Sequence, residues 1–256
     1  MSASNAYDWL VIQEQYANQP AISYEQLMAE RTVAIQAELK ADREAQAVEL
    51  RNAQVKDRAT LRRSALKLDH TNPNGVPAKL LHASFKSYVP TCAEAAKVKA
   101  SVMQFSKNVV GNLILSGSTG TGKTHMAVAT LNAIQQAGQE ALYVECATVL
   151  SLIKGNWTTR QFAENDLLNL FGETVFLVLD EVGASGFSDK DREIINTIIS
   201  HRYNKNLSTL LISNQSVSVF PEILGDRVYS RLLEHCSIFE CAWGDYRLSH
   251  DQKVHK

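Results

Sequence analysis

Hydrophobic and polar positions follow two patterns along the chain, and the change between them falls near residue 75. Between Pro20 and Pro73 there is no glycine and no proline, and alanine, glutamine, glutamate and arginine are frequent. These residues lose little side-chain entropy in a helix. One heptad position stays apolar, but its companion position holds Arg31 and Glu38, so a two-stranded coiled coil is weakly supported. The pattern predicts that residues 1–70 form a helical arm or hairpin with a partner-binding face.

A run of basic residues lies near the end of this region. Asp57 is the one acidic residue within this run. The basic residues are Lys56, Arg58, Arg62, Arg63 and Lys67. One interpretation is a solvated helix face, which needs no partner. The other is a surface that contacts DNA or a partner protein. Both interpretations remain open at the level of sequence.

The segment 69–79, DHTNPNGVPAK, has the asparagine, proline and glycine content of a linker, and we place the linker at residues 71–79. Beyond it, short apolar runs predict strands at 113–116, 141–146, 175–179, 209–213 and 237–241. Helix-like stretches lie between them, notably at 123–137 and 190–203. Strands that alternate with helices imply crossover connections and a parallel sheet covered on both faces. We therefore predict that residues 80–256 form an α/β domain with a central parallel sheet.

Composition narrows the classes of protein that fit. Hydrophobic residues make up 45% and charged residues 21% of the 256 positions, as in ordinary soluble domains. A net charge of −1 excludes a basic field over the whole surface, so any DNA contact must come from a local patch or from assembly. The four cysteines form no C-x-x-C pair, which predicts reduced thiols. Because no apolar run approaches the roughly 20 residues of a membrane span and no signal peptide is evident, we expect a cytoplasmic protein.

A glycine-rich motif at residues 117–124 carries the strongest chemical signal. A strand-like run precedes it and a helix-like stretch follows, so that glycines wrap the phosphates and amide N–H groups at the helix start point at the anion. Lys123 is expected to neutralise the β- and γ-phosphates of ATP, and the Thr124 hydroxyl to ligate Mg²⁺. The alternative is a structural turn. The motif satisfies G-x-x-x-x-G-K-[ST] and reads Gly117, Ser118, Thr119, Gly120, Thr121, Gly122, Lys123, Thr124.

Two further predicted strands end in polar residues. The run 175–179 is followed by Asp180 and Glu181, and the run 209–213 by Asn214. In a parallel sheet these ends open onto the nucleotide cleft. Asp180 would hold Mg²⁺, directly or through water, while Glu181 would orient the attacking water. Asn214 would position water beside the γ-phosphate, although an asparagine after a strand is also a common turn former.

Residues 84–247 resemble the AAA+ ATPase core of the DnaC-type replicative helicase loaders. The resemblance rests on GTGKTH (120–125), VLDEVG (178–183), SN (213–214), LGDRVYSRL (224–232) and WGDYR (243–247), with HASFKSYV (82–89) as a lead-in. It implies an AAA+ fold, ATP and Mg²⁺ as cofactors, and a helical N-terminal region that grips a hexameric replicative helicase. The IstB-type transposition helpers share the same core.

The resemblance also implies roles for individual residues. An arginine of the LGDRVYSRL segment reaches the γ-phosphate of a neighbouring subunit, and we assign this role to Arg231, with Arg227 as the alternative. Arg247 matches the phosphate-contacting sensor 2 position, and His125 belongs to the nucleotide motif. A helical insertion lines single-stranded DNA in this family. In this chain, Lys154, Trp157 and Arg160 lie there, where Trp157 either stacks on a base or packs against the adjacent helix.

These observations predict an ATPase that loads the replicative helicase onto single-stranded DNA. Two other functions fit the same residues. One is a transposition helper that recruits a transposase to target DNA, and the other is an ATP-gated binding module whose slow hydrolysis acts as a timer. The N-terminal region distinguishes them, because its partner would differ in each case.

Overall fold

The computed structural model describes residues 24–184 and 187–246. The chain forms two compact units, Met1–Asp57 and Arg58–Lys256, and each is described by itself. Helix α2 (Tyr24–Leu66) is continuous over 43 residues, so the predicted helical region is a single helix rather than a hairpin where it is described. In the first unit this helix exposes several large apolar side chains, which are Met28, Val33, Ile35, Leu39, Val48 and Leu50.

The second unit alternates helices and strands after the end of α2. Its helices are η1 (Ala78–Leu80), α3 (Ala93–Lys107), α4 (Lys123–Gln136), α5 (Cys146–Thr159), α6 (Glu164–Gly172), α7 (Asp189–Asn204), η2 (Val217–Val219), α8 (Phe220–Leu224) and α9 (Asp226–Leu233). Its strands are β1 (Asn112–Gly117), β2 (Ala141–Glu145), β3 (Phe176–Asp180), β4 (Ser208–Ile212) and β5 (Cys236–Cys241). The five predicted strands and the two predicted helices are confirmed to within one residue at each end.

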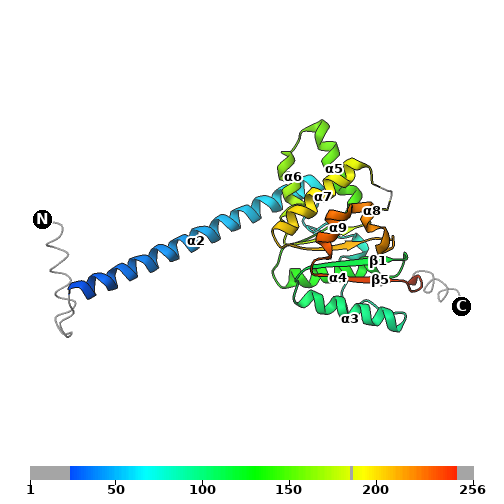
Figure 1. The fold of residues 1–256 in the computed structure, drawn as a ribbon, viewed down its shortest axis with the longest axis horizontal. Coiled ribbons are helices and arrows are strands. Elements are labelled where there is room, and N and C mark those ends of the chain that lie inside the picture. Colours follow the sequence, from blue (N-terminus) through cyan, green and yellow to red (C-terminus); the bar gives the residue numbers. More distant parts are fainter. Residues whose placement is uncertain (1–23, 185–186, 247–256) are drawn as a thin grey trace. The chain divides into compact units, whose positions relative to one another are not determined.

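The strands form one sheet in the order β2-β3-β4-β1-β5. Every neighbouring pair is parallel, with Ile114 opposite Leu211 and Tyr143 opposite Val178. Helices cover both faces, with α3 and α4 on one side and α5 to α9 on the other (Figure 1). Because both faces are covered, β3 and β4 are buried along their whole length, which explains their continuous apolar runs.

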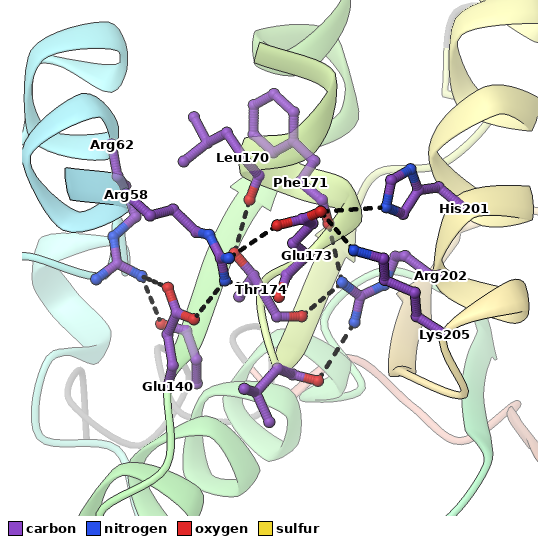
Figure 2. Close-up of polar contacts among 12 residues, drawn as sticks. Arg58, Arg62, Glu140, Leu170, Phe171, Glu173, Thr174, His201, Arg202 and Lys205 are labelled. Atoms are coloured by element: carbon purple, nitrogen blue, oxygen red, sulfur yellow. Dashed lines mark hydrogen bonds and ion pairs between the residues drawn. The ribbon is translucent and has the colours of Figure 1, made fainter. Parts of the chain in front are cut away.

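Two arginines near the end of α2 do not form a solvated face. Arg58 donates to Glu140 Oε2 at 3.3 Å and to Glu173 Oε2 at 2.9 Å, and buried Arg62 donates to Glu140 Oε1 at 3.5 Å. Figure 2 shows that Glu173 also accepts a bond from Lys205 on the opposite side. For Arg58 and Arg62 the solvated-face interpretation is therefore wrong, because two carboxylates far away in sequence compensate their charges.

The predicted linker, residues 71–79, packs against the outer edge of the sheet. The Tyr143 N–H of edge strand β2 donates to Asn74 O at 2.9 Å, and Val76 is buried. The Asn72 side chain braces the segment by bonding both N and O of Val76. An edge strand leaves backbone groups unpaired, and this segment satisfies one of them.

Two expectations from composition concern thiols and membrane segments. Cys92, Cys146, Cys236 and Cys241 are all free, and Cys146 and Cys241 are buried. In the described part of the chain, no helix combines the length and hydropathy that crossing a bilayer requires.

Candidate functional site

The loop 117–124 connects β1 to α4 and borders a cavity of about 400 Å³. Gly122 has φ 88°, and a Cβ there would lie 2.4 Å from the Tyr88 ring, so only glycine fits. The Lys123 Nζ donates to the carbonyls of Gly117 and Ser118, both at 2.7 Å. The ammonium is thus held inside the loop, beside the amide N–H groups that begin α4. This is the arrangement that binds a phosphate chain.

Two aromatic side chains from other segments of the chain hydrogen-bond to the backbone of the loop. Tyr88 Oη and Trp243 Nε1 both donate to Thr121 O, at 3.0 and 2.9 Å, and the Tyr246 N–H donates to Gly120 O at 3.0 Å. All three aromatic residues line the cavity, and rings of this kind would suit a planar ligand. Sequence reasoning gave them no role, although they lie within the HASFKSYV and WGDYR segments.

The predicted cation ligands lie together at the end of β3. Thr124 Oγ1 donates to Asp180 Oδ2 at 2.9 Å, and Asp180 is 4% exposed. A hydroxyl and a carboxylate oxygen are the hard ligands that Mg²⁺ accepts, so these residues fit a magnesium ion bound with substrate phosphates. In such a site the cation would neutralise charge on the phosphate oxygens.

Glu181 follows directly and differs from Asp180 in its environment. Its backbone has φ 58°, a left-handed conformation that is strained for a non-glycine residue. Burial, together with Glu145 and Asp180 nearby, raises the pKa of the Glu181 carboxyl. A carboxylate whose pKa is raised accepts a proton more readily, as a group that polarises water requires.

Asn214 lines the same cavity and is exposed. The preceding residue, Ser213, fixes its position, because Ser213 N donates to Leu115 O at 3.0 Å and Ser213 Oγ to Val182 O at 2.7 Å. The end of β4 is therefore tied to β1 and to the turn after β3. His125 also lines the cavity, but its Nε2 lies 3.1 Å from both Ser84 O and Ser87 Oγ, so the ring faces the lead-in segment.

The two candidate trans arginines lie on α9, and neither is among the described side chains that line this cavity. Both border a groove of about 1060 Å³ between α7 and α9. Arg231 donates to Ser200 Oγ at 2.8 Å and lies 5.3 Å from the centre of the Tyr203 ring, whereas Arg227 is exposed. Arg247, the predicted sensor 2 residue, lies outside the described residues.

The three predicted DNA contacts cluster at the end of α5. Trp157 is 39% exposed, and its Nε1 donates to Glu164 Oε1 at 3.2 Å. Lys190 of α7, which sequence reasoning missed, lies 5.6 Å from the centre of the indole. Lys154 forms an ion pair with Asp191, while Arg160 is exposed at the helix end. Trp157 is therefore not a core residue, although its indole contacts side chains of α6 and α7.

The family of the chain follows from comparison with known proteins. The model of the IstB-like ATP binding proteins matches residues 10–254. The chain belongs to this family. The predicted AAA+ resemblance is confirmed, and the family binds ATP.

Known relatives include the replicative helicase loader DnaC of Escherichia coli (strain K12), which is 29% identical over 188 residues, 72% of this chain and 77% of that protein. A crystal structure of the DnaC helicase loader is similar with a TM-score of 0.58 and 27% identity, over 64% of this chain and 99% of that one. AMPPCP-bound DnaA from Aquifex aeolicus has a TM-score of 0.57 at 18% identity, over 71% of this chain and 56% of that one. At 18% identity, the likeness to DnaA shows a shared fold.

Proposed function

We propose that this chain is an ATPase that loads a hexameric replicative helicase onto single-stranded DNA. The observation that carries the proposal is the 29% identity to DnaC over 188 residues, combined with a nucleotide cavity in which Thr124 and Asp180 are hydrogen-bonded. The identity supports the loader role. The hydrogen bond supports retention of the cation site that hydrolysis requires.

Each group around the cavity has a distinct task in this proposal. Residues 117–124 would bind the phosphates, and Lys123 would neutralise the β- and γ-phosphates. Thr124 and Asp180 hold Mg²⁺, which supplies charge neutralisation on the phosphates. Glu181 polarises the attacking water, and Asn214 orients it. Arg247 is assigned to phosphate contact within its own subunit.

A second subunit completes the site. Arg231, with Arg227 as the alternative, reaches the γ-phosphate bound by its neighbour. Both arginines border the α7–α9 groove rather than the cavity of their own chain, which favours a role in trans. ATP turnover would then depend on assembly, since each active centre needs residues from two copies.

The helicase-binding region is proposed to be residues 1–70, joined by a linker at 71–79 to an ATPase domain at 80–256. Exposed apolar side chains on α2 in the first unit support this, because Val33 and Leu50 are 65% and 62% exposed. A partner protein that covers them would supply the apolar contacts that the helix lacks in its own unit.

Removing residues 1–57 is expected to abolish binding to the replicative helicase while ATP binding persists. The cut precedes Arg58, because a cut near Pro77 would also remove Arg62 and buried Val76 from the second unit. Size-exclusion chromatography of both proteins with the helicase, ATP and single-stranded DNA measures complex formation. A fluorescent ATP analogue verifies that the shortened chain is folded.

The outcomes separate the candidate functions. If the full chain and the helicase elute separately, the loader function fails while the ATPase assignment stands. Binding to a transposase instead would favour the transposition helper. Binding to some other protein in an ATP-dependent manner would favour the gated module. If the shortened chain still binds the helicase, the contact lies in the second unit.

Replacing Trp157 by alanine is expected to weaken binding to a single-stranded oligonucleotide by about 1–3 kcal/mol, because a base loses its stacking surface. Arg160→Ala is expected to lower the salt slope by about 0.7, the value for one phosphate contact on a single strand. Fluorescence anisotropy at several salt concentrations measures both. Thr158→Ala, an exposed neighbour, is the control. Unchanged affinity in a folded Trp157→Ala protein would restrict the indole to packing on α6 and α7.

A further inference from the structure

Tyr143 is a strand residue whose side chain reaches the predicted magnesium site. It lies in β2 opposite Val178 of β3, and it is 4% exposed on the face that α3 and α4 cover. Its hydroxyl donates to Asp180 Oδ2 at 2.8 Å. An aromatic residue in an apolar strand predicts a core position, so nothing in the local pattern indicated this contact.

The parallel register explains how the contact forms. Asp180 lies two residues beyond Val178, which is a rise of about 6.6 Å along the strand and on the same side of the sheet. The length of a phenol side chain covers this rise. Asp180 Oδ2 accepts bonds from Tyr143 and from Thr124 Oγ1, while Asp180 Oδ1 accepts the Glu181 N–H at 2.7 Å. Three donors therefore hold both carboxylate oxygens.

The Tyr143 hydroxyl makes this bond as a donor, from a side chain that is buried beside Asp180. Thr124, in contrast, has lone pairs that remain available to a cation while its hydrogen points at Asp180. The tyrosine can therefore keep Asp180 in place before and after a cation binds.

The segment that follows α2 holds Tyr143 from the other side. Asn74 O accepts the Tyr143 N–H, and Gly75 packs so closely that a Cβ there would lie 2.6 Å from Tyr143 O. Gly75 also has φ 70°, which disfavours other residues. The backbone of Tyr143 is thus pinned between this segment and β3, which limits how far its ring can move.

We propose that Tyr143 is a positioning residue that holds Asp180 in the orientation in which it binds Mg²⁺ with ATP. The proposal rests on the proposed nucleotide chemistry and adds a residue to it from a strand outside the nucleotide motifs. Outer partners of metal-binding carboxylates fix the orientation of those ligands, and their loss typically costs about 10- to 100-fold in metal affinity. Tyr143 acts through Asp180 and needs no contact with the nucleotide.

The test replaces Tyr143 by phenylalanine, which keeps the ring and removes only the hydroxyl. Binding of a fluorescent ATP analogue is measured in EDTA and over a range of Mg²⁺ concentrations. In EDTA the affinity is expected to stay within about twofold of the unmodified protein. The Mg²⁺ concentration at half-saturation is expected to rise about 10- to 100-fold. A general packing defect would weaken binding in both conditions.

Tyr203→Phe is the matched control, because Tyr203 also donates to a carboxylate, that of Glu234, away from the cavity. Its Mg²⁺ dependence is expected to stay unchanged, and Asp180→Asn gives the upper limit of the effect. Unchanged Mg²⁺ dependence in Tyr143→Phe, or equal weakening in EDTA, would overturn the role of Tyr143 alone. Nucleotide binding that is independent of Mg²⁺ in the unmodified protein would overturn the proposed magnesium chemistry as well.

Discussion

Replacing Arg231 by alanine is expected to lower ATP turnover about 10³- to 10⁵-fold, the range typical of arginine fingers, while ATP binding persists. In the proposed mechanism, the guanidinium stabilises charge on the transferred phosphate only at the transition state. Within its own subunit Arg231 bonds Ser200 Oγ and borders the α7–α9 groove rather than the nucleotide cavity, so the proposal requires that a neighbouring copy receive it. Steady-state hydrolysis and binding of a fluorescent ATP analogue measure the two effects separately.

Mixing variants tests whether the arginine acts in trans. A Lys123→Ala subunit lacks the phosphate ligand but retains Arg231, so it is expected to restore turnover at interfaces with Arg231→Ala subunits. Neither variant alone is expected to hydrolyse ATP. Arg227→Ala, one turn earlier on the same helix, is the control. If Arg231→Ala is not rescued and Arg227→Ala is, the assignment moves to Arg227. Since Arg231→Ala also loses the Ser200 bond, its thermal unfolding is measured in parallel.

Replacing Arg202 by methionine is expected to lower the free energy of unfolding by about 3–5 kcal/mol. Arg202 is 1% exposed and donates to the carbonyls of Phe171, Thr174 and Ser208 and to Thr209 Oγ1. Figure 2 shows this guanidinium with its bonds to the carbonyls around Glu173. Each buried carbonyl that loses its donor costs about 1–3 kcal/mol, and relief from burying a charge offsets part of the sum.

Chemical denaturation monitored by circular dichroism measures this change. Burial lowers the pKa of Arg202 to about 9, so the guanidinium remains charged at neutral pH, where the experiment is done. Lys190→Met is the control, because Lys190 is an exposed cation on the same helix and its loss is expected to stay within about 0.5 kcal/mol. A loss below about 1 kcal/mol for Arg202→Met would mean that water or rearranged side chains satisfy the carbonyls.

Local sequence determined the strands and the phosphate loop of this protein. Strands β3 and β4 are apolar throughout because both faces of the sheet are covered, and such runs are visible without a structure. The loop is equally visible, because Gly122 adopts a conformation that other residues rarely adopt and leaves no room for a Cβ. The juxtaposition of Thr124 and Asp180 was predictable too, since parallel strands end at one edge of the sheet.

Only the tertiary structure decided which distant side chains meet. Strand order and register bring the Tyr143 hydroxyl to Asp180. Neither property can be predicted from the hydrophobic pattern of a single strand. The same holds for Arg58, whose partners are Glu140, between α4 and β2, and Glu173, between α6 and β3. These ion pairs make Arg58 a structural residue, whereas the basic run suggested a solvated face or a binding surface. Local patterns specify what a segment buries, whereas the partner of a polar group depends on geometry that many segments determine together.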